Sequence, residues 1–166
     1  MRVYTAGPLG FSEAGRPFHA RIVDTLEQLG HTVLDPWDFA PDKIVAVAAL
    51  PYGQDKKRAW NELNAQIGKR NEQLIDSCDV VLAVLDGVDV DSGTAAEVGY
   101  AYARGKRVLG YRGDFRLASD NEGALVNLQV EYFIRNSGGM IIQRIEQLPA
   151  ALLEIFAAPS RSSPNS

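Results

Sequence analysis

The sequence predicts a single α/β domain with a mainly parallel sheet at its centre. Three observations predict this fold class. Short apolar runs alternate with longer segments of helical spacing, Gly and Pro residues separate these segments, and one central run is almost continuously apolar. Such a run is typical of a central parallel strand that helices cover on both faces. A chain of 166 residues is long enough to bury one core without disulfides.

The first third of the chain contains two expected strands with a helix between them. Residues 2–7 (RVYTAG) are predicted as the first strand, and a helix is predicted over 17–29, where Gly30 ends it. The second strand is expected at 31–36 (HTVLDP). Segment 37–54 contains two prolines and is interpreted as a loop or short helix that covers a site.

A long helix is predicted over residues 55–77. Its buried stripe is expected to consist of Trp60, Leu63, Ile67 and Leu74. Asn71 falls on the same stripe, so this helix is expected to direct a polar group inward.

The remaining segments continue the alternation of strands and helices. In chain order we expect a strand at 79–86 (DVVLAVLD), a helix at 94–104, a strand at 107–112, a loop at 113–122, a short segment at 124–134, a strand near 139–143 (GMIIQ) and a final helix at 148–158. The prediction is therefore a flavodoxin/Rossmann-like three-layer sandwich with a five-stranded, mainly parallel sheet. One domain is expected over 1–158, followed by a flexible tail at 159–166 (PSRSSPNS).

Composition excludes several classes of function. No apolar run approaches the roughly 18 residues of a membrane span, and the first residues lack the features of a signal peptide, so a soluble, cytoplasmic protein is expected. The net charge of −4, without a dense Lys/Arg cluster, argues against polymeric nucleic acid as a partner.

Metal and cofactor motifs are absent from the sequence. Cys78 is the only cysteine and is expected to be a small core residue. His19 and His31 lie in no ligand-spaced motif, so no metal is predicted. The sequence also lacks both the G-x-G-x-x-G pattern and the P-loop pattern, and no cofactor is expected.

Ligands of open parallel sheets bind beyond the carboxyl ends of the strands, where the strand order reverses. The first strand brings residues 4–8 to this edge, the central strand brings residues 86–97, and Asn71 lies on the helix that leads into the central strand. We therefore expect Tyr4, Asp91 and Glu97 to converge there.

Each of these residues also has a purely structural interpretation. Thr94 and Glu97 fit a capping box, in which each side chain would bind the other residue's backbone amide. Asp91 can be a turn former before Gly93, and Tyr4 can be a sheet residue with its hydroxyl at the rim. Asn71 on an apolar stripe is most often a core amide with satisfied hydrogen bonds. The helix start after the most buried strand can instead hold an ionised Glu97, a credible nucleophile.

Four segments together resemble the nucleoside 2-deoxyribosyltransferase family. They are VYTAGPLGF at 3–11, KRNEQLIDSCDVVLAVLDG at 69–87, DSGTAAEVGYAYARGKRVL at 91–109 and, more loosely, VNLQ at 126–129. The resemblance covers most of residues 1–130, and its most specific part is the core D-x-G-T-x-x-E-x-G-x-A.

The resemblance implies that Glu97 attacks the anomeric carbon of a deoxyribonucleoside, so that the base leaves and a deoxyribosyl enzyme forms. A second base then attacks the same carbon, and the configuration is retained. Tyr4 would orient the Glu97 carboxylate, and Asp91 would bind a sugar hydroxyl or the base. The expected substrate-binding residues are Gly7, Pro8, Asp38, Asn71, Gly93 and Asn127.

The resemblance also implies a homo-oligomer, and this chain differs from several family members at one site residue. Asn127 matches a position that reaches a neighbouring subunit's site, so a homo-oligomer, a dimer or larger, is expected. Several family members carry Asp where this chain has Asn71, and the acid that protonates the leaving base is open between Asp91 and Asp38. The rival functions are hydrolysis of deoxynucleoside 5-monophosphates and nucleotide sensing without turnover. Asp91 and Asn127 favour nucleosides, and the presence of Glu97 and Tyr4 argues against a sensor.

Overall fold

A computed structural model describes residues 1–157, so the expected tail at 159–166 lies outside the described residues. The five strands form one sheet in the order β2-β1-β3-β4-β5, and every pair is parallel. The α/β prediction is confirmed, and the sheet is entirely rather than mainly parallel. The strands are β1 (Arg2–Ala6), β2 (Thr32–Leu34), β3 (Val80–Val84), β4 (Arg107–Tyr111) and β5 (Ile141–Ile142).

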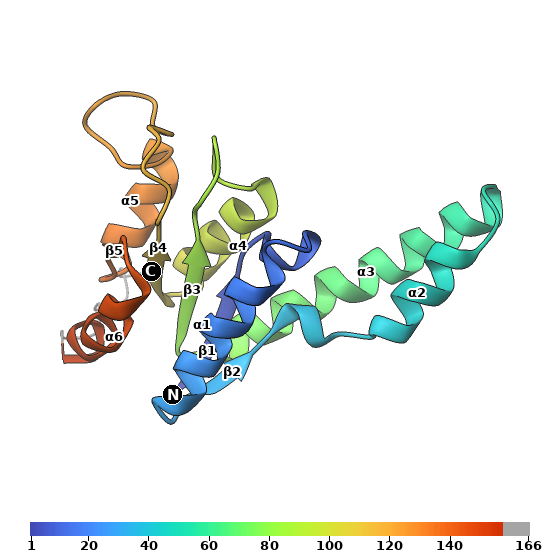
Figure 1. Ribbon diagram of the computed structural model, residues 1–166, viewed down its shortest axis with the longest axis horizontal. Coiled ribbons are helices and arrows are strands. Elements are labelled where there is room, and N and C mark those ends of the chain that lie inside the picture. Colours follow the sequence, from blue (N-terminus) through green and yellow to red (C-terminus); the bar gives the residue numbers. More distant parts are fainter. Residues whose placement is uncertain (158–166) are drawn as a thin grey trace, which may run out of the picture.

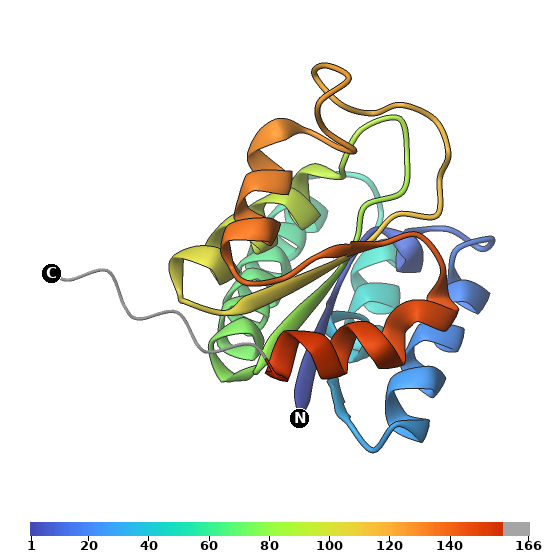
Figure 2. The same cartoon turned by 90° about the vertical axis from the view of Figure 1, so that its left-hand side faces the viewer.

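Helices cover both faces of the sheet, as Figures 1 and 2 show. Helices α1 (Arg16–Gln28) and α6 (Leu148–Ala157) pack on one face, where Val80, Leu82 and Leu109 are buried. Helices α3 (Gln54–Ser77), α4 (Ser92–Ala103) and α5 (Leu128–Asn136) cover the other face, together with Val81 and Ala83. Every residue of β3 is buried, as its continuous apolar run predicts.

Segment 37–54 contains a short helix, one of the two alternatives expected for it. Short 3-10 helix η2 (Pro36–Asp38) contacts β1, and then α2 (Pro41–Ala49) packs along the outer half of α3. Figure 1 shows this helical pair extending away from the sheet. Two members of the predicted stripe, Leu63 and Leu74, are buried, whereas Trp60 and Ile67 are partly exposed.

Side chains cap the starts of two helices on the face that α3 covers. Helix α4 begins at Ser92 rather than Thr94, because Asp91 is its N-cap. Helix α5 begins at Leu128, within the segment expected at 124–134, because Asn127 caps it. Two further 3-10 turns are η1 (Leu9–Phe11) and η3 (Ile145–Gln147). No helix among residues 1–157 is long and apolar enough to cross a membrane.

Candidate active site

The strand order reverses between β1 and β3. From β1 the chain passes to β2 on one side, and from β3 it passes through β4 to β5 on the other. The loops that follow β1 and β3 therefore diverge at this switch point, which is where parallel sheets bind their ligands. Tyr4 on β1 pairs with Val81 on β3, so Tyr4 lies where the two diverging strands adjoin.

Three side chains from separate parts of the chain meet beside this junction. The Tyr4 hydroxyl donates a hydrogen bond to Glu97 Oε1 over 2.7 Å. Asn71 Nδ2 donates to the same oxygen over 3.2 Å. Tyr4 comes from β1, Asn71 from α3 and Glu97 from the second turn of α4. Both of these hydrogen bonds go to Oε1, and no hydrogen bond within residues 1–157 goes to Oε2.

The start of α4 explains why Glu97 is available for these contacts. Asp91 Oδ2 accepts hydrogen bonds from the Thr94 backbone amide at 2.9 Å and from the Thr94 hydroxyl at 3.1 Å. Asp91 is therefore the N-cap, and the alternative of a capping box between Thr94 and Glu97 is wrong. The turn-forming interpretation of Asp91 holds. Glu97 lies in α4 beyond the capped helix start, and its carboxylate accepts a hydrogen bond from Tyr4 on β1.

Burial and hydrogen bonding act on Glu97 in opposite directions. Burial raises its pKa most strongly, and the nearby Asp91 carboxylate raises it further. The hydrogen bonds from Tyr4 and Asn71 lower the pKa, because they favour the charged form. Burial and the adjacent Glu97 also raise the pKa of Tyr4 far above its usual range. Tyr4 therefore stays protonated and acts as a hydrogen-bond donor.

Asn71 reaches this cluster from α3 and contributes no charge. Its Oδ1 atom is buried and has no hydrogen-bond partner among residues 1–157. The expectation of a core amide with satisfied hydrogen bonds is thus met for the nitrogen only. An unpartnered buried acceptor beside a carboxylate can receive a hydrogen bond from a donor on a bound molecule.

Glycines shape the loops on both sides of the cluster. A Cβ atom at Gly7 would lie 2.9 Å from Val84 Cβ, so the chain after β1 passes β3 too closely for a side chain. Pro8 then caps η1, which places AGP in a tight turn. At Gly93 an added Cβ would lie 3.2 Å from Asp91 Oδ2, close to the capping carboxylate.

Two predicted site residues form no hydrogen bond with Tyr4, Asn71 or Glu97. Asp38 is exposed at the end of η2, and no hydrogen bond or ion pair joins it to Tyr4, Asn71 or Glu97. Asn127 uses its Oδ1 to accept from the backbone amides of Gln129 at 3.0 Å and Val130 at 3.4 Å. Neither residue forms a hydrogen bond with Glu97 of its own chain.

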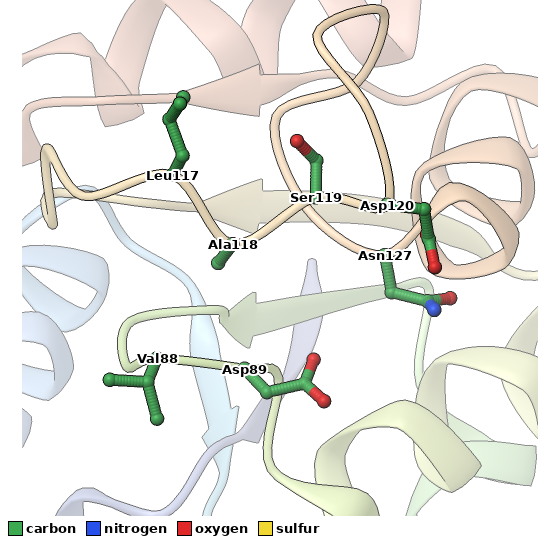
Figure 3. Close-up of a pocket in the computed structure, with 7 residues that line it drawn as sticks. All are labelled: Val88, Asp89, Leu117, Ala118, Ser119, Asp120 and Asn127. Carbon is green, nitrogen blue, oxygen red and sulfur yellow. The ribbon is translucent and has the colours of Figure 1, made fainter.

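A shallow cavity of about 260 Å³ contains Asn127 at its edge. Figure 3 shows that its lining comes from the loops after β3 and β4: Val88, Asp89, Leu117, Ala118, Ser119, Asp120 and Asn127. The polar side chains are carboxylates, a hydroxyl and an amide, which suit a ligand with hydroxyl groups. Neither Tyr4 nor Glu97 lines this cavity, so it is separate from the cluster.

The sequence analysis did not predict a contact between His19 on α1 and Asp35, the N-cap of η2. His19 Nε2 and Asp35 Oδ2 are 2.7 Å apart, and Asp35 Oδ1 accepts from the Trp37 backbone amide at 2.9 Å. The indole of Trp37 packs over Gly10, where a Cβ atom would overlap it, and against the edge of Phe11 at 4.6 Å between ring centroids. An aspartate directly before a proline at a strand end was the available signal.

Within residues 1–157 no group of three or more His, Cys, Asp or Glu side chains is arranged to hold a metal ion. The cluster offers one partly buried carboxylate, two neutral donors and a second carboxylate at a helix start. These groups can bind a polar organic molecule and can present a carboxylate oxygen to it.

The fold and the partly buried glutamate beside its switch point define an α/β protein with a candidate site at the carboxyl edge of its sheet. The sequence model of the nucleoside 2-deoxyribosyltransferase family matches residues 3–129, and the chain belongs to this family. The matched region contains every predicted site residue. Proteins of this family modify nucleosides, as transferases or as N-glycosidases.

Similar proteins of known structure share the whole fold. A conserved protein from Enterococcus faecalis V583 is 26% identical, with a TM-score of 0.63 over 95% of this chain and 98% of that one. A 2-deoxyribosyltransferase from Bacillus psychrosaccharolyticus is 23% identical, with a TM-score of 0.62 over 89% and 90%. A CMP N-glycosidase from Clostridium botulinum is 20% identical, with a TM-score of 0.50 over 92% and 98%.

An uncharacterized protein of Schizosaccharomyces pombe is similar in sequence. It is 26% identical over 182 residues, which cover 84% of this chain and 79% of that protein.

Proposed function

We propose that the protein transfers 2-deoxyribose between nucleobases through a covalent deoxyribosyl intermediate on Glu97. One observation carries the proposal. Tyr4 and Asn71 both donate to Glu97 Oε1, so Oε2 is left to react, and the carboxylate is held in one orientation at the switch point. Membership of the family supports the substrate class, deoxyribonucleosides and free bases.

In the first step, Glu97 Oε2 forms a bond to the anomeric carbon of the sugar. The bond from that carbon to the base nitrogen breaks, and its electron pair leaves with the base. The transition state resembles an oxocarbenium ion, so the negative Glu97 stabilises it before the new bond is complete. In the second step, the nitrogen of another base attacks the same carbon, and the bond from that carbon to Glu97 breaks with its electron pair returning to the carboxylate. The acid that protonated the first base accepts the proton that the incoming base loses. Two inversions give retention of configuration.

The departing base must receive a proton. Asn71 cannot supply one, because it is a neutral amide. Of the two acids considered, Asp91 lies near enough to Glu97 to raise its pKa, whereas Asp38 forms no hydrogen bond or ion pair with Tyr4, Asn71 or Glu97. We therefore assign two roles to Asp91: it binds the sugar or the base, and it transfers the proton to the leaving base. Its Oδ1 atom is free of the Thr94 hydrogen bonds, which both go to Oδ2.

The proposal includes an oligomer. Asn127 forms no hydrogen bond with Glu97 of its own chain, and it lies at the edge of the cavity between the loops after β3 and β4. We propose that a homo-oligomer brings Asn127 to a neighbouring subunit's site, where it binds the sugar 5-hydroxyl. Light scattering of wild-type protein tests the oligomer, and a monomer with full transferase activity would exclude this role.

The experiment is incubation with deoxyinosine and adenine, followed by chromatography. We expect deoxyadenosine and hypoxanthine from wild type. Glu97→Ala should produce neither, while Glu62→Gln, at an exposed glutamate on α3, should match wild type. Hypoxanthine with free deoxyribose would instead indicate a hydrolase. If several donors, including deoxynucleoside 5-monophosphates, are all unchanged, the protein is a sensor and the proposal is wrong.

A further inference from the structure

Arg112 follows β4 directly and is buried, with 4% of its surface exposed. It is the only Arg or Lys among residues 1–157 that is buried to this extent. A guanidinium cannot lose its charge in a protein interior, so it requires hydrogen-bond acceptors there. Its acceptors therefore reveal what this side chain does.

All three acceptors of the Arg112 guanidinium are backbone carbonyls. One NH group donates to Leu85 O at 2.5 Å, and the other donates to Gly87 O at 3.1 Å and to Arg116 O at 2.8 Å. Leu85 and Gly87 belong to the loop after β3, whereas Arg116 belongs to the loop after β4. Because the acceptors are main-chain atoms, Arg112 fixes the paths of two loops rather than the rotamers of their side chains.

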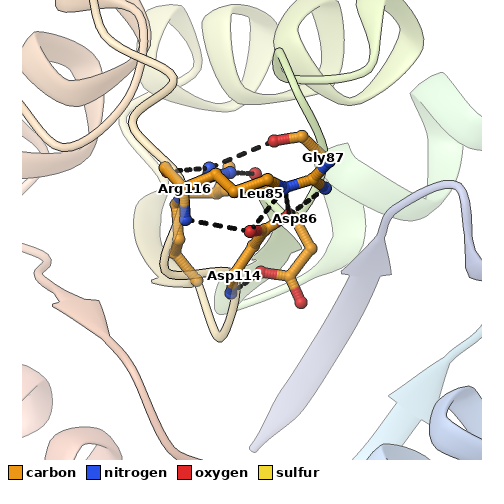
Figure 4. A network of polar contacts seen from close by, with 6 residues as sticks. Leu85, Asp86, Gly87, Asp114 and Arg116 are labelled. Carbon is orange, nitrogen blue, oxygen red and sulfur yellow. Dashed lines mark hydrogen bonds and ion pairs between the residues drawn. The ribbon is translucent and has the colours of Figure 1, made fainter.

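A second contact joins the same two loops. Asp86 Oδ1 accepts a hydrogen bond from the backbone amide of Asp114 at 2.8 Å. The Asp114 carboxylate in turn pairs with the guanidinium of Arg116. Figure 4 shows Leu85, Asp86, Gly87, Asp114 and Arg116 gathered in this network. We name the contacts of Arg112 and Asp86 between the loops the loop latch.

Both latched loops lead to candidate site residues. The first loop runs from Leu85 to Asp91, which caps the helix that carries Glu97. The second runs from Arg112 to Asn127, which caps α5. Between them lies the cavity that is lined by Val88 and Asp89 on one side and by residues 117–120 and 127 on the other. The relative position of these groups thus depends on the latch.

We infer that Arg112 is a positioning residue of the active site, which acts through the carbonyls of Leu85, Gly87 and Arg116. Its three hydrogen bonds and its burial leave it directed at the main chain and not at a substrate. Arg is required because its planar fork serves several carbonyls at fixed angles, whereas the compact ammonium of Lys on a flexible stem does not. The kinetic part of this inference rests on the proposed function, but the structural part does not.

The structural part is tested by amide hydrogen exchange of Arg112→Lys and wild type. We expect faster exchange at residues 86–91 and 113–117 together, because both loops lose acceptor contacts, and no change in β1 or α6. Arg116→Ala is the matched control: it removes the ion pair with Asp114 but leaves the carbonyl that Arg112 binds. If residues 86–91 exchange at the wild-type rate in Arg112→Lys, the inference is wrong.

The kinetic part is tested with deoxyinosine and adenine. A small misplacement of catalytic groups costs up to about 100-fold in rate, so we expect kcat of Arg112→Lys to fall by about 10- to 100-fold with KM nearly unchanged. Arg116→Ala should keep wild-type kcat. If Arg112→Lys does not fold, as judged by circular dichroism, Asp86→Ala breaks the second contact alone and should lower kcat in the same way. Wild-type kcat in the folded variant would overturn the positioning role.

Failure of the proposed function would give a different result. In that case wild type would neither transfer nor hydrolyse any donor, and the exchange experiment would still decide whether Arg112 holds the two loops together.

Discussion

Replacing Tyr4 by Phe removes one atom from the proposed active site. The ring is fully buried, and its hydroxyl donates to Glu97 Oε1 over 2.7 Å, a short distance typical of a bond to a charged acceptor. Such a bond contributes about 1.5–3 kcal/mol. Because the bond favours the ionised form, its loss must raise the pKa of Glu97 beyond the increase that burial already causes.

The magnitude depends on pH. At a pH below the pKa of Glu97 in both proteins, only a small fraction of either protein carries an ionised Glu97. The lost bond energy lowers that fraction in the variant, so its kcat/KM falls by about 10- to 150-fold, since each 1.36 kcal/mol corresponds to a factor of ten. At alkaline pH both carboxylates are ionised, and only the lost orientation remains. The deficit of Tyr4→Phe should therefore grow as pH falls.

The assay is a profile of kcat/KM against pH for transfer from deoxyinosine to adenine. The acidic limb of Tyr4→Phe should lie at higher pH than that of wild type. Tyr100→Phe is the control, because Tyr100 on the same helix α4 donates instead to Asp76 at 3.1 Å and to Glu72 at 3.4 Å. If the deficit of Tyr4→Phe is the same at every pH, Tyr4 does not set the ionisation of Glu97, and this reasoning is refuted.

Three other substitutions test the same site. Glu97→Gln should raise Tm at pH 7, by about 2–4 °C for each kcal/mol gained in the free energy of unfolding, because burial penalises only the ionised form of Glu97. The gain should vanish as pH falls and Glu97 becomes protonated. Equal Tm values at pH 7 would contradict this. Asn71→Asp should shift the acidic limb upward by like-charge repulsion, and an unmoved limb would count against it. Gly7→Ala should lower the free energy of unfolding by about 1–3 kcal/mol in urea titrations through overlap with Val84, whereas exposed Gly68→Ala should not.

The sequence by itself determined the fold class and most elements, because these follow from local patterns. Apolar periodicity and the positions of Gly and Pro located five strands and the main helices, and the central strand was recognisable from its unbroken apolar run. The family resemblance also selected Glu97, Tyr4 and Asp91 as candidates, since its motif keeps them in a fixed order.

The tertiary structure alone decided which of these residues meet. Tyr4 and Glu97 are 93 positions apart, and Asn71 and Glu97 are 26 apart, so no local pattern encodes either hydrogen bond. The cap at Asp91 excluded a capping box at Thr94, which had fitted the sequence equally well. Nothing in the sequence distinguishes Arg112 from other residues that follow a strand. Its role follows from three carbonyls that only the packing of two loops brings together, because backbone acceptors leave no mark on residue type.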